Sequence, residues 1–489
     1  MKLAQTQLEL IPQSLVSHEG LEFGMARTPE GLRLAVLTGN DEAVLKAFEG
    51  KLQTTSEGQV LLADLSAHNA AALRQRLPWL QPRLLGLATS VGMGDRLGLA
   101  TPGHVRALKQ VGGGIAPIFA QQSMREMART VRTPQNVMDD ATWGIFQEGW
   151  QGGIGADADH LKTTQDIDVC LAAGFTFFTI DPGDHVDNRA EGTDLAGLKT
   201  LAQALPEHMQ GNASQLLETT IDLESKSIYF DEKTLLKAMV KYGRAIDHVA
   251  NMYRHLIKTA GSKAVELEVS VDETEQPTSH AEHVYFASEL KRLGVKWVSL
   301  APRYVGRFEK GVDYIGDLVA FKADIEGHAV IARKFGPYKL SLHSGSDKFS
   351  IYLIAMKTTK GLVHLKTAGT SYLEALHTVA MKDVDFLKEI YSFARERYET
   401  DRLTYHVSAQ LSRAPLPEAV TNWPALLAQF DAREILHVTF GSVLREQRED
   451  GNLRFAERLF ALLRAHPETY AGNLEQHFIK HLKPFSLKE

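Results

Sequence analysis

Several ionisable residues lie close together in one short segment, GADADHLKT. Two aspartates, a histidine and a lysine fall between Asp157 and Lys162, directly after the glycine-rich stretch QEGWQGGIGA. Carboxylates and imidazoles carry protons in catalysis and also bind divalent metals. The segment is interpreted as a solvated loop, a helix cap or part of an active site, and the rest of the chain must decide between these.

Other ionisable residues alternate with apolar ones. His343 alternates with leucines in KLSLHSG, His364 and Lys366 do so in LVHLKT, and Glu266 and Glu268 do so in VELEVSVDE. Since alternate side chains of a strand share a face, each set lies opposite its apolar neighbours. Helices cover the apolar face of a parallel strand, so the polar face is expected to point into the protein.

Burying this many ionisable groups costs free energy unless they are paired or bind a metal. A single histidine at a strand end is usually a hydrogen-bonded core residue, but His160, His343 and His364 together favour a divalent-metal site. Glu266 is a candidate for catalysis. Both it and Glu268 have a simpler interpretation as ion-pair partners of nearby lysines.

Four further polar motifs need an interpretation of their own. Asp95 and Arg96 contact substrate or form a salt-bridged loop. SGSDK, at 344–348, binds an anion or caps a helix. DPGDHVD, at 181–187, contains turn chemistry and is interpreted as structural or substrate-shaping, and HAEH, at 280–283, as a solvated helix start.

Eight short apolar runs carry these residues, and a helical stretch follows most of them. The runs are RLLGLATSVG, GIAPIFAQQS, GGIGADADHLK, FTFFTIDPGDH, AVELEVSVDETE, VKWVSLAPRY, YKLSLHSGSDK and GLVHLKTAGTS. Such runs, separated by helices, predict parallel βα units, and eight of them predict an α/β fold of the (β/α)8 TIM-barrel type. Their polar C-terminal ends then meet on the face where such barrels build active sites.

The remaining chain flanks or interrupts this barrel. Residues 1–80 predict a small mixed α/β segment, with strands at GLRLAVLT and GQVLLADLS and a helix at DEAVLKAFEGKL. The barrel is expected at 81–384, with an insertion at about 186–260 after the fourth strand. Residues 385–489 are expected to form a mainly helical extension outside the barrel.

The composition excludes several classes of protein. Hydrophobic residues make up 44% and charged residues 23% of the 489-residue chain, as in ordinary globular proteins. A net charge of −6 argues against nucleic-acid binding, and no apolar run predicts a membrane span. The single cysteine, Cys170, excludes an intramolecular disulfide and is interpreted as a packing residue. The chain start lacks the apolar core of a signal peptide, which favours a cytoplasmic location.

The long strand-end motifs resemble those of one known family. GADADHLKT, FTIDPGDHVDN, ELEVSVDETEQPTSHAEH, LAPRYVGRFEKGVDY, LSLHSGSDKFSIY and LVHLKTAGTSYLEAL together are similar to motifs of the bacterial tagaturonate epimerases. The resemblance implies a metal-dependent barrel enzyme that interconverts D-tagaturonate and D-fructuronate in galacturonate catabolism. It implies Asp159 as proton acceptor, Glu266 as proton donor, and His160, His343 and His364 as ligands of a divalent cation. Such ligands suit Zn, Mn, Ni or Fe.

The implied uronate substrate carries a carboxylate at neutral pH, so a cation should bind it. The candidates near predicted strand ends are Arg96, Lys162, Arg303, Lys348 and Lys366, with Asp95 as a further substrate contact. Lys162 and Lys348 are favoured because they adjoin the implied ligands.

Two other functions stay open: a class II-type metal-dependent sugar-acid aldolase and a non-catalytic sugar-acid-binding protein. Retro-aldol cleavage and direct proton exchange are both compatible with two carboxylates. The sequence is also compatible with a homo-oligomer.

Asp159 and His160 are adjacent, so on a regular strand they would face opposite ways. They reach one site only if a loop or bulge begins at Asp159. We therefore predict such a bulge, with His160 turned toward His343 and His364, and Asp157 deeper in the barrel as a partner.

Overall fold

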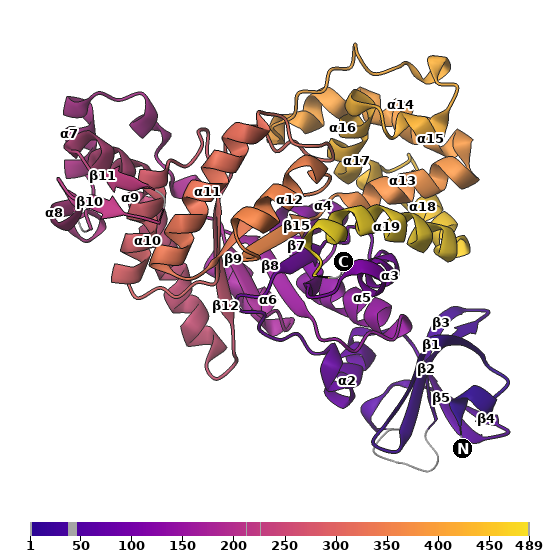
Figure 1. Cartoon of the computed structure of the whole chain (residues 1–489). Helices are drawn as coiled ribbons and strands as arrows, with labels where there is room; N and C mark the ends of the chain where they lie inside the picture. Colours follow the sequence, from indigo (N-terminus) through magenta and orange to yellow (C-terminus); the bar gives the residue numbers. More distant parts are fainter. Residues whose placement is uncertain (1, 38–45, 212, 225, 488–489) are drawn as a thin grey trace.

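Eight parallel strands close into a barrel in the computed structural model, which describes residues 2–37, 46–211, 213–224 and 226–487 (Figure 1). Around the barrel they are β6 (Ser90–Met93), β7 (Ala116–Ser123), β8 (Gly155–Leu161), β9 (Phe177–Ile180), β12 (Glu266–Val271), β13 (Ser299–Pro302), β14 (Lys339–Leu342) and β15 (Val363–Thr367). β15 pairs with β6 and closes the ring. Each predicted run contains one of these strands, so the predicted TIM-type barrel is confirmed.

A helix follows each strand and covers the outside of the barrel. In chain order the helices are α3 (Thr101–Val111), α4 (Met124–Thr130), α5 (Pro134–Gln147), α6 (Thr164–Ala172), α9 (Glu232–Ala260), α10 (His280–Arg292), α11 (Leu318–Phe335), α12 (Phe349–Thr358) and α13 (Thr370–Lys382). Every residue of β12 is buried. Its valines and Leu267 belong to the apolar core, whereas Glu268 contacts groups inside the barrel. The polar face therefore points inward, as the alternation predicts.

The segment between β9 and β12 contains a small subdomain before the long helix α9. It holds α7 (Leu195–Gln203), α8 (Ala213–Leu216) and a hairpin of β10 (Thr220–Asp222) and β11 (Ser227–Tyr229). Figure 1 shows this insertion on the side of the barrel away from the N-terminal sheet. DPGDHVD forms a turn here, in which Asp181 accepts a hydrogen bond from the N–H of Gly183 at 2.8 Å.

The N-terminal segment is an antiparallel sheet followed by α2 (Ala67–Arg76). Its strands, in sheet order, are β1 (Glu9–His18), β2 (Leu21–Thr28), β3 (Gly31–Leu37), β5 (Gly58–Ala63) and β4 (Gly50–Thr55). The two predicted strands are present. Residues 41–45 of the predicted helix lie outside the described residues, and the prediction is wrong for Gly50–Leu52, which pair with β5. Hairpin pairing outweighs the weak helix preference of this segment.

Helices after β15 pack against the barrel helices. They are α14 (Val384–Asp401), α15 (Trp423–Leu426), α16 (Phe430–Val438), α17 (Phe440–Arg445), α18 (Ala456–Ala465) and α19 (Pro467–Leu482). α19 lies against α3 and α13. Among the described residues, no helix combines the length and apolarity needed to cross a membrane. The segment boundaries at 80 and 384 remain predictions.

Two minor sequence interpretations have different outcomes. Cys170 is buried in α6, with its sulfur 3.9 Å from that of Met124, as expected of a packing residue. HAEH does begin α10, but His283 is not solvated. Its ring nitrogens lie 2.9 Å from His328 and 2.8 Å from the Tyr338 hydroxyl, because α11 packs over this turn.

A buried carboxyl pair joins α16 to the loop between β13 and α11. Glu309 accepts hydrogen bonds from the backbone and hydroxyl of Ser408, and Glu434 accepts one from the backbone of Ala409. Burial, reinforced by the neighbouring charge of Glu309, raises the pKa of Glu434 to about 8. Glu434 therefore keeps its proton near neutral pH in the folded protein.

This raised pKa predicts a stability change with pH. The folded protein binds the proton of Glu434 more tightly than the unfolded chain, so the resulting stability is present at low pH and is lost as pH rises from about 4.3 to about 8. We expect Glu434→Gln to gain stability relative to wild type between pH 5.5 and 8, by about 1 kcal/mol or more. Thermal unfolding of wild type, E434Q and the exposed control Glu418→Gln measures this. A difference that does not vary with pH contradicts it.

Candidate active site

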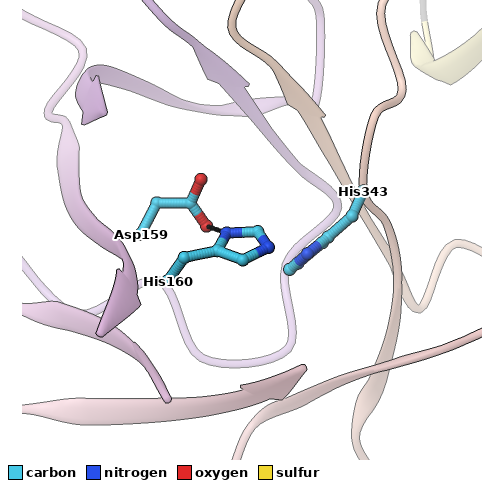
Figure 2. Close-up of side chains that lie close together, drawn as sticks. All are labelled: Asp159, His160 and His343. Atoms are coloured by element: carbon cyan, nitrogen blue, oxygen red, sulfur yellow. Dashed lines mark hydrogen bonds and ion pairs between the residues drawn. The ribbon is translucent and has the colours of Figure 1, made fainter. Parts of the chain in front are cut away.

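A bulge in β8 brings two adjacent ionisable residues to the same site. Pairing with β9 runs through Ala158 and resumes only at Leu161, and His160 has a φ of +53°. This left-handed conformation breaks the alternation of side chains. Figure 2 shows Asp159 and His160 side by side, with the His160 ring turned toward His343 at a centroid distance of 4.9 Å. The predicted bulge and the turn toward His343 are confirmed.

Asp159, His160 and His343 form a group that could hold a metal ion, since each offers a ligand atom within 4.8 Å of the others. His160 donates from Nδ1 to Asp159 at 2.8 Å, and His343 donates from Nε2 to Glu268 at 2.6 Å. Each imidazole thus has one nitrogen held by a carboxylate, a pattern typical of metal-binding histidines.

The other two ring nitrogens both face Asp272, and His160 Nε2 also faces Glu273 at 3.9 Å. Asp272 Oδ1 lies 3.2 Å from His343 Nδ1 and 3.9 Å from His160 Nε2. In a tetrahedral site with bonds near 2.1 Å, neighbouring ligand atoms are about 3.4 Å apart. Both separations are close to that value, so Asp272 is placed to join the two histidines as a ligand of a divalent cation.

The electrostatics of this group also favour a cation. Burial opposes charge on both imidazoles, but the adjacent carboxylates outweigh it and raise the pKa of His160 to about 10 and that of His343 to about 9. Asp159 acts mainly on the first, and Asp272 with Glu268 on the second. Carboxylates that stabilise two protonated imidazoles would stabilise a metal ion in place of those protons.

Lys366 lies beneath the group and joins three carboxylates. Its Nζ is 2.8 Å from Asp157, 2.7 Å from Asp159 and 2.8 Å from Glu268. Burial opposes charge on Asp159 and Glu268, but the neighbouring cations prevail and hold the pKa of both carboxyls well below the usual range. Asp157 therefore has the deeper position predicted for it, and Asp159 is ionised at neutral pH.

Two cavities meet above this group. The inner cavity has a volume of about 30 Å³ and is lined by Gln121, Glu126, Asp159, His160 and Lys366, among others. The outer cavity has a volume of about 300 Å³ and is lined by Asp272, Glu273, Arg303, Tyr304, Arg307 and His406, among others. Both share Arg125, Lys310, His343, Ser344 and Tyr405. Only the outer cavity has room for a six-carbon chain.

A family model described as tagaturonate epimerase matches residues 11–485. The chain belongs to the tagaturonate epimerase family. It is 42% identical over 480 residues to the tagaturonate/fructuronate epimerase of Thermotoga maritima, covering 97% of this chain and 96% of that protein. The native crystal structure of fructuronate-tagaturonate epimerase UxaE from Cohnella laeviribosi matches with a TM-score of 0.93 and 36% identity, covering 99% and 97% of the two chains. A glycerol complex of the same enzyme gives a TM-score of 0.92 at 36% identity, covering 98% and 96%. The chain is therefore an epimerase, an isomerase acting on carbohydrate.

The structure does not bring His364 or Glu266 to this group. His364 Nδ1 lies 2.9 Å from the Ser90 hydroxyl, and its Nε2 lies 4.0 Å from Asp157, one inward position below Lys366. Glu266 begins β12 and accepts hydrogen bonds from the backbone of Leu85 and Gly86, at the opposite end of the barrel. Six residues separate it from Asp272, which is about 20 Å along a strand. The geometry therefore gives Glu266 no reach to Asp159.

Most of the cations considered for the substrate carboxylate are engaged elsewhere. The side chain of Lys162 is partly exposed, and its ammonium pairs with Asp184 at 2.8 Å. Lys348 is buried, and its ammonium donates to three backbone carbonyls. Lys366 is surrounded by carboxylates. The Asp95 carboxylate accepts three backbone N–H groups and shapes its own loop.

Arginines and a tyrosine complete the mouth of the site. Arg96 lines the inner cavity and pairs with Glu126 there, and Arg303 lines the outer cavity. Arg125, which sequence reasoning missed, pairs with Glu273 at 2.9 Å. It lies in the first turn of α4, two residues after the end of β7, and this position near a strand end could have revealed it. No sequence motif around Tyr405 indicates that it belongs to the site. It comes from the segment after α14 and reaches the mouth only in the folded chain.

The place of Glu266 predicts a structural rather than a proton-transfer role. We expect Glu266→Gln to lower the melting temperature, because an amide cannot accept both backbone N–H groups. Its kcat/KM for tagaturonate should stay within about threefold of wild type, whereas Asp159→Asn should lose about 10²-fold or more. Steady-state kinetics with calorimetric melting measures both. A 10²-fold loss in E266Q at unchanged melting temperature would restore its assignment as proton donor.

Proposed function

We propose that this epimerase interconverts D-tagaturonate and D-fructuronate with a divalent cation held at the mouth of the barrel. The observation that carries the proposal is the β8 bulge, which places Asp159 and His160 in one site with His343. The name of the Thermotoga maritima relative supplies the substrate pair.

His160, His343 and Asp272 would hold the cation. Their facing atoms are His160 Nε2, His343 Nδ1 and Asp272 Oδ1, at the distances given above. When bound, the ion would act as a Lewis acid toward the ketone and a neighbouring hydroxyl of the substrate. This set keeps two of the three histidines that the resemblance implies and replaces His364, which lies deeper, with a carboxylate.

Asp159 and Glu273 are proposed as the proton-transfer pair. Asp159 lines the inner cavity and Glu273 the outer one, so the two carboxylates flank a substrate bound between them. Asp159 is ionised and able to accept a proton. Glu273 takes the donor role that the resemblance assigns to Glu266.

The chemistry requires such a pair because the inverted carbon is β to the ketone, and its C–H is not acidified by enolisation. In a retro-aldol route, Asp159 takes the proton of the hydroxyl on that carbon, and the adjacent C–C bond breaks to an aldehyde and an enolate. The aldehyde rotates, the bond re-forms on the other face, and Glu273 delivers a proton to the new alkoxide. Burial opposes charge on Glu273, but His160 and Arg125 outweigh it and hold the pKa of this carboxyl below its usual range, so Glu273 must first take that proton from solvent. Arg125 pairs with Glu273 and positions it.

Metal removal tests this function. We expect protein stripped with a chelator to lose at least about 10²-fold in kcat, and one of Zn, Mn, Ni or Fe to restore it. NMR of tagaturonate follows the fructuronate formed, and a persistent three-carbon product would instead identify an aldolase. Full turnover by metal-free protein contradicts the proposal. In D2O, deuterium at the inverted carbon would indicate direct proton exchange in place of retro-aldol cleavage.

Matched variants test the ligand set. His343→Gln and Asp272→Asn should lose bound metal, whereas His364→Gln should retain it, as measured by elemental analysis of the purified proteins. Loss of metal from H364Q alone would return His364 to the ligand set.

A further inference from the structure

Lys310, at the mouth of the barrel, is a cation that takes part in none of the ion pairs described above. Lys310 belongs to the loop between β13 and α11 and lines both the inner and the outer cavity. Among the described residues, no hydrogen-bond or ion-pair partner of its ammonium is found, although the side chain is partly buried. Burial lowers the pKa of Lys310, even though Glu126 and Glu273 act in the opposite direction. A partly buried cation without a hydrogen-bond or ion-pair partner is available to bind an anion that enters the cavity.

The neighbouring cations are less suited than Lys310 to bind such an anion. Arg125 pairs with Glu273, and Arg96 pairs with Glu126. Nη1 of Arg96 has no partner in the described part of the chain, but this arginine lines only the inner of the two cavities. Arg303 lines the outer cavity. Its Nη1 donates to the carbonyl of Thr274, but its Nε is buried without a partner in the described part of the chain. Lys310 and Arg303 both line the outer cavity, so two unsatisfied donor groups border the same space.

The length of a hexuronate matches this arrangement. Its carboxylate carbon is two C–C bonds of about 1.5 Å from the inverted carbon, so its oxygens lie within about 4 Å of that carbon. A carbon placed between Asp159 and Glu273 sits at the boundary of the two cavities, where Lys310 is found. The inner cavity has the volume of about one water molecule, so the carboxylate end must extend into the outer cavity.

The loop that carries Lys310 is held in place from outside the barrel. Glu309, its neighbour, accepts two hydrogen bonds from Ser408. Tyr405 and His406 of the same C-terminal segment line the outer cavity, and the Tyr405 hydroxyl is hydrogen-bonded to Arg129. These contacts fix the loop and close the outer cavity on the side of the C-terminal segment.

We propose that Lys310 binds the carboxylate of the uronate, with Arg303 as a second donor in this anion subsite of the outer cavity. The inference rests on the proposed function, since it assigns one end of that substrate. It predicts that Lys310 is the main determinant of the preference for a uronate over the neutral ketohexose of the same configuration, which has a CH2OH group in place of the carboxylate.

The test compares Lys310→Met with the exposed control Lys322→Met. Steady-state kinetics give KM for tagaturonate, and competitive inhibition gives Ki for D-tagatose. We expect K310M to raise KM at least 30-fold, to leave Ki within twofold and to lower kcat less than tenfold. Metal content should be unchanged, Lys310→Arg should recover part of the loss, and K322M should behave as wild type.

Other outcomes overturn the assignment. A KM within twofold of wild type removes Lys310 from the subsite, and a parallel rise in Ki for tagatose shows that it supports the cavity without binding the carboxylate. Titration calorimetry of tagaturonate with wild type and K310M tests the subsite without turnover. If wild type binds tagaturonate but does not epimerise it, the proposed function fails while the subsite is still decided by the affinity ratio of the two proteins.

Discussion

Lys366 places one positive charge among three buried carboxylates, and the interior of the barrel depends on this contact. Removing ions from water costs several kcal/mol each, so Asp157, Asp159 and Glu268 are tolerable together because the ammonium of Lys366 contacts all three. The imidazoles of His160 and His343 add positive charge beside Asp159 and Glu268. The carboxylates come from β8 and β12, and Lys366 from β15. The pairing thus links three strands that are not all neighbours in the barrel. Glu268 in turn orients His343, so the same charge balance sets the direction of an imidazole at the mouth.

The β8 bulge brings Asp159, one of the three carboxylates that Lys366 contacts, and the adjacent His160 to the mouth of the barrel. Asp159 is bound from below by Lys366 and holds His160 beside it. Without the left-handed residue at 160, the imidazole would lie on the helix-covered face. The bulge costs ladder hydrogen bonds with β9, and the contacts among Asp159, His160 and His343 offset that cost. The irregular backbone of β8 therefore produces the geometry of the proposed site.

Eight apolar runs separated by helical stretches were enough to predict the fold, and the alternation of polar and apolar residues predicted the inward faces of β12, β14 and β15. The pattern could not predict how deep in the barrel each inward-facing side chain lies. Glu266, Glu268 and Asp272 share a face in the sequence pattern, but only the last lies at the mouth, because strand register decides which end each residue reaches. His364 and Lys366 differ in the same way. Long-range contacts were also beyond the pattern: Tyr405 and Lys310 meet at the mouth although some 95 residues separate them.

The position of α19 has a consequence for how the enzyme becomes active in the cell. This helix lies near the end of the chain, yet it packs against α3, which follows the first strand of the barrel, and against α13. The segment that contributes Tyr405 and braces the Lys310 loop is likewise made after all eight strands. During synthesis, a barrel emerging from the ribosome has its charged interior before it has the outer wall of its substrate cavity. A nascent chain that lacks this segment would therefore present an open mouth, and the proposed substrate cavity would be enclosed only after the segment has been made.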